Sequence, residues 1–207
     1  MSRFAVINSI MNTFSASLLY PVIILLVALS LLSLILIGEF LSEYAKRNRD
    51  IENLESTCFT VQNHVKGSNF KAAADALRKI KQNYIVTAFS NAAAVHLEQD
   101  RIPAIEWVSQ EYEIKMAKRL EQTRIITNIA PMLGLMGTLI PLGAALVALS
   151  QGDVVQLAHN LMIAFATTVV GLFASSVAYI LTQIRKRWYW QDMADIDYIL
   201  DTIEAKV

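Results

Sequence analysis

The chain has 207 residues, of which 55% are apolar and 17% are charged. Its mean hydropathy is positive, which is unusual for a soluble protein and makes a lipid bilayer the first hypothesis. The formal net charge is zero, so composition gives no reason to expect nucleic acid as a partner, and a single cysteine, Cys58, excludes a disulfide within the chain. We expect the Cys58 thiol to have no role beyond packing.

Residues 1–17 precede the first uncharged run. Apolar residues recur there at helical spacing: Phe4, Ile7, Ile10 or Met11, and Phe14. This spacing predicts a short amphipathic helix on the outer face of a membrane, and a frayed tail is the alternative.

Residues 18–38 carry no charge and are long enough to cross a hydrocarbon core, which needs about 20 helical residues. We interpret them as the first transmembrane helix. A cleaved signal peptide would have a shorter apolar run and a cleavage site made of small residues.

Residues 39–124 are rich in good helix formers, which predicts a helical bundle. A break is expected at Gly67-Ser68-Asn69, so the helix of the first span should continue to about Val65. The stretch 70–98 repeats apolar residues every three or four positions, as one face of a packed helix does. From Ile105 the helical pattern continues without a breaker into the next uncharged run.

Two further uncharged runs, 125–150 and 157–184, predict the second and third transmembrane helices. Residues 151–156 between them include Gly152 and Asp153 and are typical of a tight helical hairpin at a membrane surface. The remaining residues, 185–207, are predicted to form a C-terminal helix. The expected fold class is therefore all-α, an integral membrane protein with three transmembrane helices.

Lysine and arginine are distributed unevenly along the chain. Thirteen of the eighteen lie between the first and second spans, four follow the third span and one precedes the first, whereas the 151–156 loop has none. The positive-inside bias then places the middle segment and the C-terminus in the cytoplasm, and the N-terminus and the loop outside. Trp188, Tyr189 and Trp190 follow the last basic cluster and predict an aromatic belt at the membrane interface.

The second and third spans each have a stripe of small residues at helical spacing. The stripes consist of Ala130, Gly134, Gly137 with Thr138, Pro141, Ala144 with Ala145, and Ala148 on the second span, and of Ala164, Thr167 with Thr168, Gly171, Ala174 with Ser175, Ala178 and Thr182 on the third. Close helix packing is one interpretation, since small residues commonly serve it in bilayers. The other is a ring of hairpins around a narrow passage, whose hydroxyl groups position water and protons without a buried charge.

Neither span contains Asp or Glu within the membrane. A carboxylate that binds and releases protons at mid-bilayer would therefore have to come from a partner helix. His159, near the outer end of the third span, is expected to have a capping or interfacial role. We find no catalytic, metal-ligating or cofactor-binding motif. The glycine-rich 134–138 segment lacks the lysine of a phosphate-binding loop. The sequence also has no paired-histidine metal motif, no nucleophile elbow and no cysteine pair.

The run Ala130-Pro131-Met132-Leu133-Gly134-Leu135-Met136-Gly137-Thr138 resembles the second-span signature of the ExbB, TolQ and MotA proton channel family. The run Ala166-Thr167-Thr168-Val169-Val170-Gly171-Leu172 resembles the third-span motif of the same family. The resemblance implies that Thr138 and Thr168, with the adjacent Thr167, line a proton pathway. It also implies a helix-packing and pore-facing surface made of Ala130, Pro131, Gly134, Gly137, Pro141, Ala164, Gly171 and Ser175.

The layout, with a single span before the cytoplasmic segment, is similar to ExbB and TolQ, whereas MotA has two. The resemblance implies a homopentamer in the cytoplasmic membrane of a bacterium or archaeon, built around a dimer of a single-span, ExbD- or TolR-like partner. A membrane aspartate of that partner would supply the missing carboxylate, and proton flow would energise transport or another envelope process.

Two positions depart from the family pattern. Ile163 stands where ExbB and TolQ usually have a glutamate, and Pro141-Leu142 replaces a more usual glycine. The run 134–143, together with the later Arg187-Trp188-Tyr189, resembles a subgroup associated with cobaltochelatase-like proteins in haem or corrinoid handling. A membrane scaffold that anchors a partner without conducting protons is the alternative function.

Overall fold

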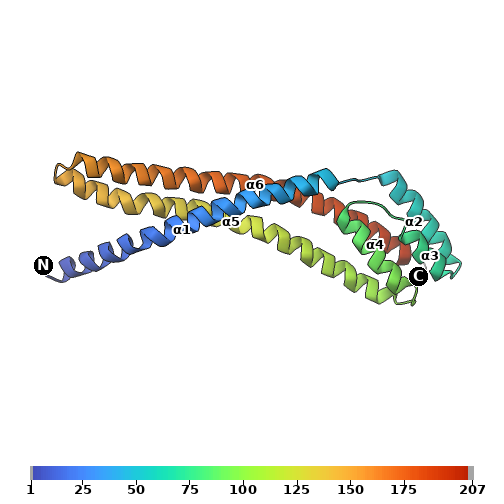
Figure 1. The fold of residues 1–207 in the computed structure, drawn as a ribbon. Coiled ribbons are helices and arrows are strands. Elements are labelled where there is room, and N and C mark those ends of the chain that lie inside the picture. Colours follow the sequence, from blue (N-terminus) through green and yellow to red (C-terminus); the bar gives the residue numbers. More distant parts are fainter. Residues whose placement is uncertain (1, 205–207) are drawn as a thin grey trace. The chain divides into compact units, whose positions relative to one another are not determined.

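The computed structural model of the chain describes residues 2–204, except for the side chains of residues 2–6, 8, 9 and 12. The described part contains six helices and no strand (Figure 1). The helices are α1 (Ser2–Lys46), α2 (Ile51–Lys66), α3 (Phe70–Leu77), α4 (Tyr84–Leu97), α5 (Ile102–Ser150) and α6 (Val154–Glu204). The predicted all-α fold class is thus confirmed.

Three of these helices, α1, α5 and α6, are long and apolar enough to cross a membrane. The chain divides into two compact units. We call the first, Met1–Glu39 with Gln122–Thr182, the membrane unit, and the second, Phe40–Glu121 with Gln183–Val207, the bundle unit.

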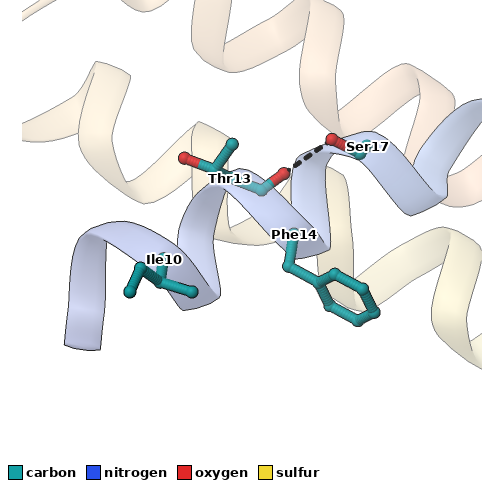
Figure 2. A pocket seen from close by; sticks show the side chains of 4 residues that line it. All are labelled: Ile10, Thr13, Phe14 and Ser17. Atoms are coloured by element: carbon teal, nitrogen blue, oxygen red, sulfur yellow. Dashed lines mark hydrogen bonds between the residues drawn. The ribbon is translucent and has the colours of Figure 1, made fainter. Parts of the chain in front are cut away.

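In the membrane unit, α1 runs without a break from the N-terminal segment through the first apolar run. One face of α1 is buried within the unit, at Val22, Leu26 and Ser33. Toward its N-terminal end, α1 carries a shallow hollow between successive turns, lined by Ile10, Thr13, Phe14 and Ser17 (Figure 2). The lining is mostly apolar and comes from a single helix, so the hollow brings no set of polar groups together.

The turn between α5 and α6 is shorter than the six residues that the sequence suggested. Gly152 adopts a φ of 74°, a left-handed conformation that glycine tolerates without strain. The Asp153 carboxylate then accepts a hydrogen bond from the Gln156 N–H at 2.9 Å, which caps α6 and lets the helix begin at Val154. The two helices leave this tight turn as an antiparallel hairpin.

The bundle unit corrects two expectations about helix length. The helix of the first span was expected to reach about Val65, but α1 ends at Lys46 and α2 begins at Ile51, where Asp50 caps it by accepting from the Asn53 N–H. The stretch 70–98 was expected to be one helix, but it contains α3 and α4, and Asn83 caps the second of them by accepting from the Val86 N–H. In both cases a side-chain cap satisfies the free N–H groups of a new helix start.

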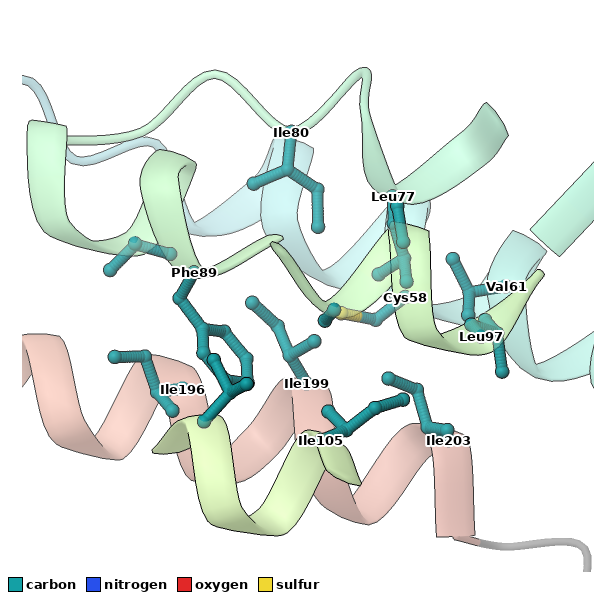
Figure 3. Close-up of a cluster of buried hydrophobic side chains, with 14 of the residues drawn as sticks. Cys58, Val61, Leu77, Ile80, Phe89, Leu97, Ile105, Ile196, Ile199 and Ile203 are labelled. Atoms are coloured by element: carbon teal, nitrogen blue, oxygen red, sulfur yellow. The ribbon is translucent and has the colours of Figure 1, made fainter. Parts of the chain in front are cut away.

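The core of the bundle unit is a cluster of buried apolar side chains from α2, α3, α4, α5 and α6 (Figure 3). Phe89, Ile105, Ile196 and Ile199 lie at its centre with no exposed surface. Cys58 is also part of this core and is 1% exposed. Burial raises the pKa of its thiol to about 11, which agrees with a packing role.

The aromatic residues after the last basic cluster do not form a uniform interfacial belt. Trp188 and Tyr189 are buried in the bundle unit, and only Trp190 is largely exposed. The Trp188 ring stacks on Phe40 with centroids 5.0 Å apart, and the Arg47 guanidinium lies 5.0 Å from its centroid. The belt prediction is therefore wrong for Trp188 and Tyr189, because apolar partners within the chain cover them.

Candidate functional site

The α5–α6 hairpin of the membrane unit has a buried seam of mostly small residues, which we call the hairpin seam. On α5 it consists of Thr123, Ile126, Ala130, Gly134, Gly137, Pro141, Ala145 and Ala148, and on α6 of Asn160, Ala164, Thr167, Gly171, Ala174, Ala178 and Leu181. These residues recur every three or four positions, so each helix presents one continuous face to the other. Most members of the two predicted stripes belong to this seam.

Glycines let the two backbones approach closely along the seam. A Cβ at Gly137 would lie 2.7 Å from the Thr167 Cβ, and a Cβ at Gly171 would lie 2.8 Å from the Ala130 carbonyl oxygen. Neither position has room for a side chain without movement of its neighbour. Close packing, the first interpretation of the stripes, therefore accounts for Gly137, Gly171, Ala130 and Thr167.

Thr138 and Thr168 lie beside the seam and are half-buried. Each directly follows a seam residue, Gly137 or Thr167, and those two residues face each other. In an antiparallel helix pair, the positions that follow opposed seam residues project to the same side of the pair, because each step of about 100° carries them there. Thr138 and Thr168 thus share one side of the hairpin and one depth along it.

The same side carries further hydroxyl groups, and we call it the hydroxyl edge: Thr127, Thr138, Thr168, Ser175 and Thr182. The opposite edge of the seam is aliphatic, with Leu133, Ile140, Ile163, Val170 and Val177. The two sides of the hairpin therefore differ in polarity, one carrying hydroxyl groups and the other aliphatic side chains. Ile163, which departs from the family pattern, lies on the aliphatic edge.

Hydrogen bonds bridge the two helices along the hydroxyl edge. The Ser175 hydroxyl donates to the Thr127 carbonyl at 2.8 Å, and the Thr182 hydroxyl lies 2.6 Å from that of Thr123. Pro131 explains the first of these, because it has no N–H to offer the carbonyl four residues before it, which is that of Thr127. In a membrane helix such a freed carbonyl takes a donor from a neighbouring helix.

The Thr138 and Thr168 hydroxyls donate within their own helices. Thr138 donates to the Leu135 carbonyl at 2.7 Å and Thr168 to the Ala164 carbonyl at 3.1 Å. Because a hydroxyl has one hydrogen and two lone pairs, each oxygen can still accept a hydrogen bond from water. The hydroxyl edge can thus position water without any charge of its own.

Ionisable groups are scarce in the apolar part of the hairpin. Between Ile125 and Ile184 the sequence contains one carboxylate, Asp153 in the turn, and one histidine, the exposed His159. Within the described residues no group of three or more histidine, cysteine or acidic side chains is placed to hold a metal ion.

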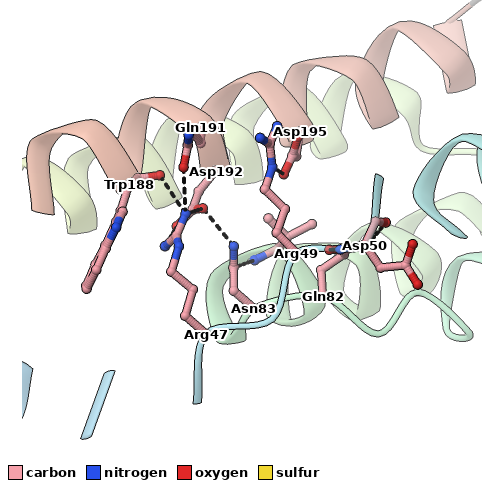
Figure 4. Close-up of polar contacts among 10 residues, drawn as sticks. Arg47, Arg49, Asp50, Gln82, Asn83, Trp188, Gln191, Asp192 and Asp195 are labelled. Atoms are coloured by element: carbon pink, nitrogen blue, oxygen red, sulfur yellow. Dashed lines mark hydrogen bonds and ion pairs between the residues drawn. The ribbon is translucent and has the colours of Figure 1, made fainter. Parts of the chain in front are cut away.

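The bundle unit contains a polar network that sequence reasoning missed, formed where the α1–α2 link meets α6 (Figure 4). Arg47 binds both carboxylate oxygens of Asp192, at 2.7 and 3.3 Å, and the Asn83 amide donates to the same carboxylate at 2.7 Å. Arg49 binds both oxygens of Asp195, at 3.0 and 2.7 Å. The sequence offered only two signals for this network. Arg47 and Arg49 come shortly before the helix cap Asp50, and Asp192 and Asp195 lie three positions apart on one helix.

Asp192 is 1% exposed, so its charge depends on these partners. Burial raises the pKa of the Asp192 carboxyl, and the hydrogen bonds from Arg47 and Asn83 act against that rise. The network fixes the non-helical link between α1 and α2 onto α6 within the bundle unit.

Comparison with known protein families identifies a family that this chain resembles over most of its length. The model of the MotA/TolQ/ExbB proton channel family matches residues 76–197, which is more than half of the chain and includes the part of the α5–α6 hairpin that lies in the membrane unit. No curated protein sequence matches the chain.

Proposed function

The chain belongs to the MotA/TolQ/ExbB proton channel family, and we propose that it is the channel-forming subunit of a complex driven by the proton-motive force. The family consists of membrane proton channels rather than enzymes. The observation that supports this function best is the hydroxyl edge, with Thr138 and Thr168 at one depth in a hairpin whose only carboxylate in the membrane unit lies in the turn, at Asp153.

In the proposed complex, several copies of the hairpin turn their hydroxyl edges toward a common axis. Water held by Thr138 and Thr168 delivers protons to an aspartate of a single-span partner, since this chain has no carboxylate of its own at that depth. The expected assembly is a homopentamer around a dimer of an ExbD- or TolR-like protein. Each proton that crosses about 100 mV releases roughly 2.3 kcal/mol, so useful work requires several protons or a coupled cycle.

The proposed setting is a bacterial or archaeal cytoplasmic membrane, with the N-terminus and the α5–α6 turn outside. One span before the cytoplasmic bundle favours the ExbB and TolQ type. The driven process is proposed to be transport or another envelope process, and the resemblance of residues 134–143 to the subgroup linked with cobaltochelatase-like proteins points to haem or corrinoid handling.

The test is proton flux through the complex purified from its native membrane in mild detergent with its co-purifying partner and reconstituted in liposomes. Thr138→Val and Thr168→Val keep side-chain shape but remove a hydroxyl, and each should lower flux at least tenfold. Thr167→Val should lower it less, because the Thr167 side chain packs against Gly137. Ser33→Ala removes a buried hydroxyl from α1 and should leave flux unchanged.

The alternative function, a scaffold that conducts no protons, predicts a different result. Both threonine variants would then support the driven process as well as the wild type does. Purification as a monomer without any single-span protein would also contradict the channel proposal.

A further inference from the structure

The second proline of α5 leaves a backbone carbonyl without its helical partner. Pro141 has no N–H, so the Gly137 carbonyl four residues before it loses its usual hydrogen bond. Pro131 does the same to the Thr127 carbonyl, but there the Ser175 hydroxyl has taken the place of the missing N–H. The carbonyls that the two prolines of α5 leave free can therefore be compared directly.

No side chain in the described part of the chain donates to the Gly137 carbonyl. The nearest hydroxyls already use their single hydrogen: Thr138 donates to Leu135, and Thr167 and Thr168 donate to carbonyls of α6. A buried carbonyl that lacks its usual donor is destabilising, and more so where no bulk water can reach it. The Gly137 carbonyl thus receives no hydrogen bond from Pro141 or from these hydroxyls, and it can accept one from a donor outside the chain.

Asn160 provides a second polar group on the same seam. The residue is 8% exposed, and its Nδ2 atom has no hydrogen-bond partner among the described residues. Asn160 lies two helical turns before Thr167, toward the α5–α6 turn, and therefore faces the part of α5 that follows Gly137. Between the carbonyl and the amide the seam has only small side chains, those of Pro141, Ala145 and Ala164.

We propose that the hairpin seam holds internal water between the Gly137 carbonyl and the Asn160 amide. Water fits both groups, because it donates to the carbonyl and accepts from the amide, and internal waters typically join two to four such polar partners. The second part of the inference rests on the proposed function. It is that this water forms the segment of the proton path between the α5–α6 turn and the level of Thr138 and Thr168.

In that path a proton moves as an excess proton on water and no group of this chain changes its own charge. The Gly137 carbonyl and the Thr138 and Thr168 oxygens accept hydrogen bonds from the protonated water, which stabilises its charge. The proton leaves to the next water and finally to the carboxylate of the partner. Pro141 and Asn160 would supply, without ionisable side chains, the polar groups that this half of the hairpin otherwise lacks.

The first experiment measures proton flux of reconstituted complexes that carry Pro141→Ala or Asn160→Leu. Pro141→Ala restores an N–H for the Gly137 carbonyl, so it should leave the thermal midpoint unchanged or raise it while lowering flux at least tenfold. Asn160→Leu keeps the volume but removes the amide and should lower flux by a similar factor. Pro131→Ala is the matched comparison and should lower flux much less, because the Thr127 carbonyl already has a donor. If Pro141→Ala fails to assemble, Pro141→Ser restores the same N–H.

The second experiment does not depend on flux. A density map of the wild-type complex that resolves waters elsewhere in the protein should show water within hydrogen-bond distance of the Gly137 carbonyl oxygen and of the Asn160 amide. A dry seam in that map, or wild-type flux in both variants, would overturn the inference. Loss of flux in Thr168→Val with full flux in Pro141→Ala and Asn160→Leu would reject this water site and keep the proposed function. A wet seam in a complex that conducts no protons would reject the proposed function alone.

Discussion

Single side chains decide how closely the two long membrane helices approach. Gly137 and Gly171 lie where a methyl group would meet the facing helix at under 3.0 Å, whereas Gly143 has open space around it. The small-residue stripes were predictable from sequence, because a period of three to four residues identifies a helix face. The sequence did not predict which residues of a stripe contact the partner helix and which lie beside the contact, since that depends on how the second helix docks.

Gly171→Ala should destabilise the hairpin by about 1–3 kcal/mol, because the new methyl group would meet a backbone oxygen that has no flexible end to move aside. Thermal unfolding of the detergent-solubilised protein measures the effect. Gly143→Ala is the matched control and should change the midpoint little. An unchanged midpoint for Gly171→Ala would show that the helices are farther apart than described.

The Cys58 thiol should react slowly with an aromatic disulfide reagent at pH 8. Burial raises its pKa to about 11, so the neutral form dominates until the pH approaches that value, and the stability gained from burying the neutral thiol is lost as pH rises from the ordinary thiol pKa toward 11. Denaturation should accelerate the reaction at least a hundredfold. Ser56→Cys in a Cys58→Ala background places a thiol on the exposed side of the same helix and should react fast without denaturation. Fast reaction of native Cys58 would contradict its place in the core.

Helix boundaries in the bundle unit depend on caps and on contacts distant in sequence. The break at residues 67–69 was predicted, because Gly67 and Asn69 are common at helix ends. The breaks before α2 and α4 were missed, since Asp50 and Asn83 resemble ordinary polar surface residues until their side chains are seen to cap a helix. The two arginine–aspartate pairs that hold the first of these breaks join residues about 145 positions apart, which no local pattern reveals.

Asp192→Ala should release the α1–α2 link. It leaves the Arg47 guanidinium, whose side chain is 12% exposed, without its buried partner, and breaking such a pair costs about 3–5 kcal/mol. Limited trypsin digestion should then cut after Arg47 or Arg49 at least ten times faster than in the wild type. Asp75→Ala, which breaks an exposed pair with Arg78, should not change cleavage at these sites. Equal cleavage rates for the two variants would mean that the network does not hold the link.

At the scale of the whole molecule, the three apolar helices and the family could both be predicted from sequence. Uncharged runs of sufficient length indicate spans, and two motifs in the right order indicated the family that the comparison confirms. The hydroxyl edge could not be predicted as a surface, because Thr127 and Thr138 on α5 lie on the same side as Thr168 and Ser175 on α6 only when the two helices pack as a hairpin. Orientation, partner and oligomeric state stay predictions, since they depend on other chains and on the membrane.

The most direct test of the central claim, that hydroxyl edges of neighbouring hairpins face one another around a common axis, is cross-linking between subunits. Thr168→Cys and, as matched control, Val170→Cys on the aliphatic edge are each placed in a Cys58→Ala background, and native membranes are treated with a short thiol-to-thiol cross-linker. The account predicts covalent dimers of this chain from Thr168→Cys and few or none from Val170→Cys. Dimers from Val170→Cys alone, with Thr168→Cys reacting only with lipid-soluble thiol reagents, would contradict it.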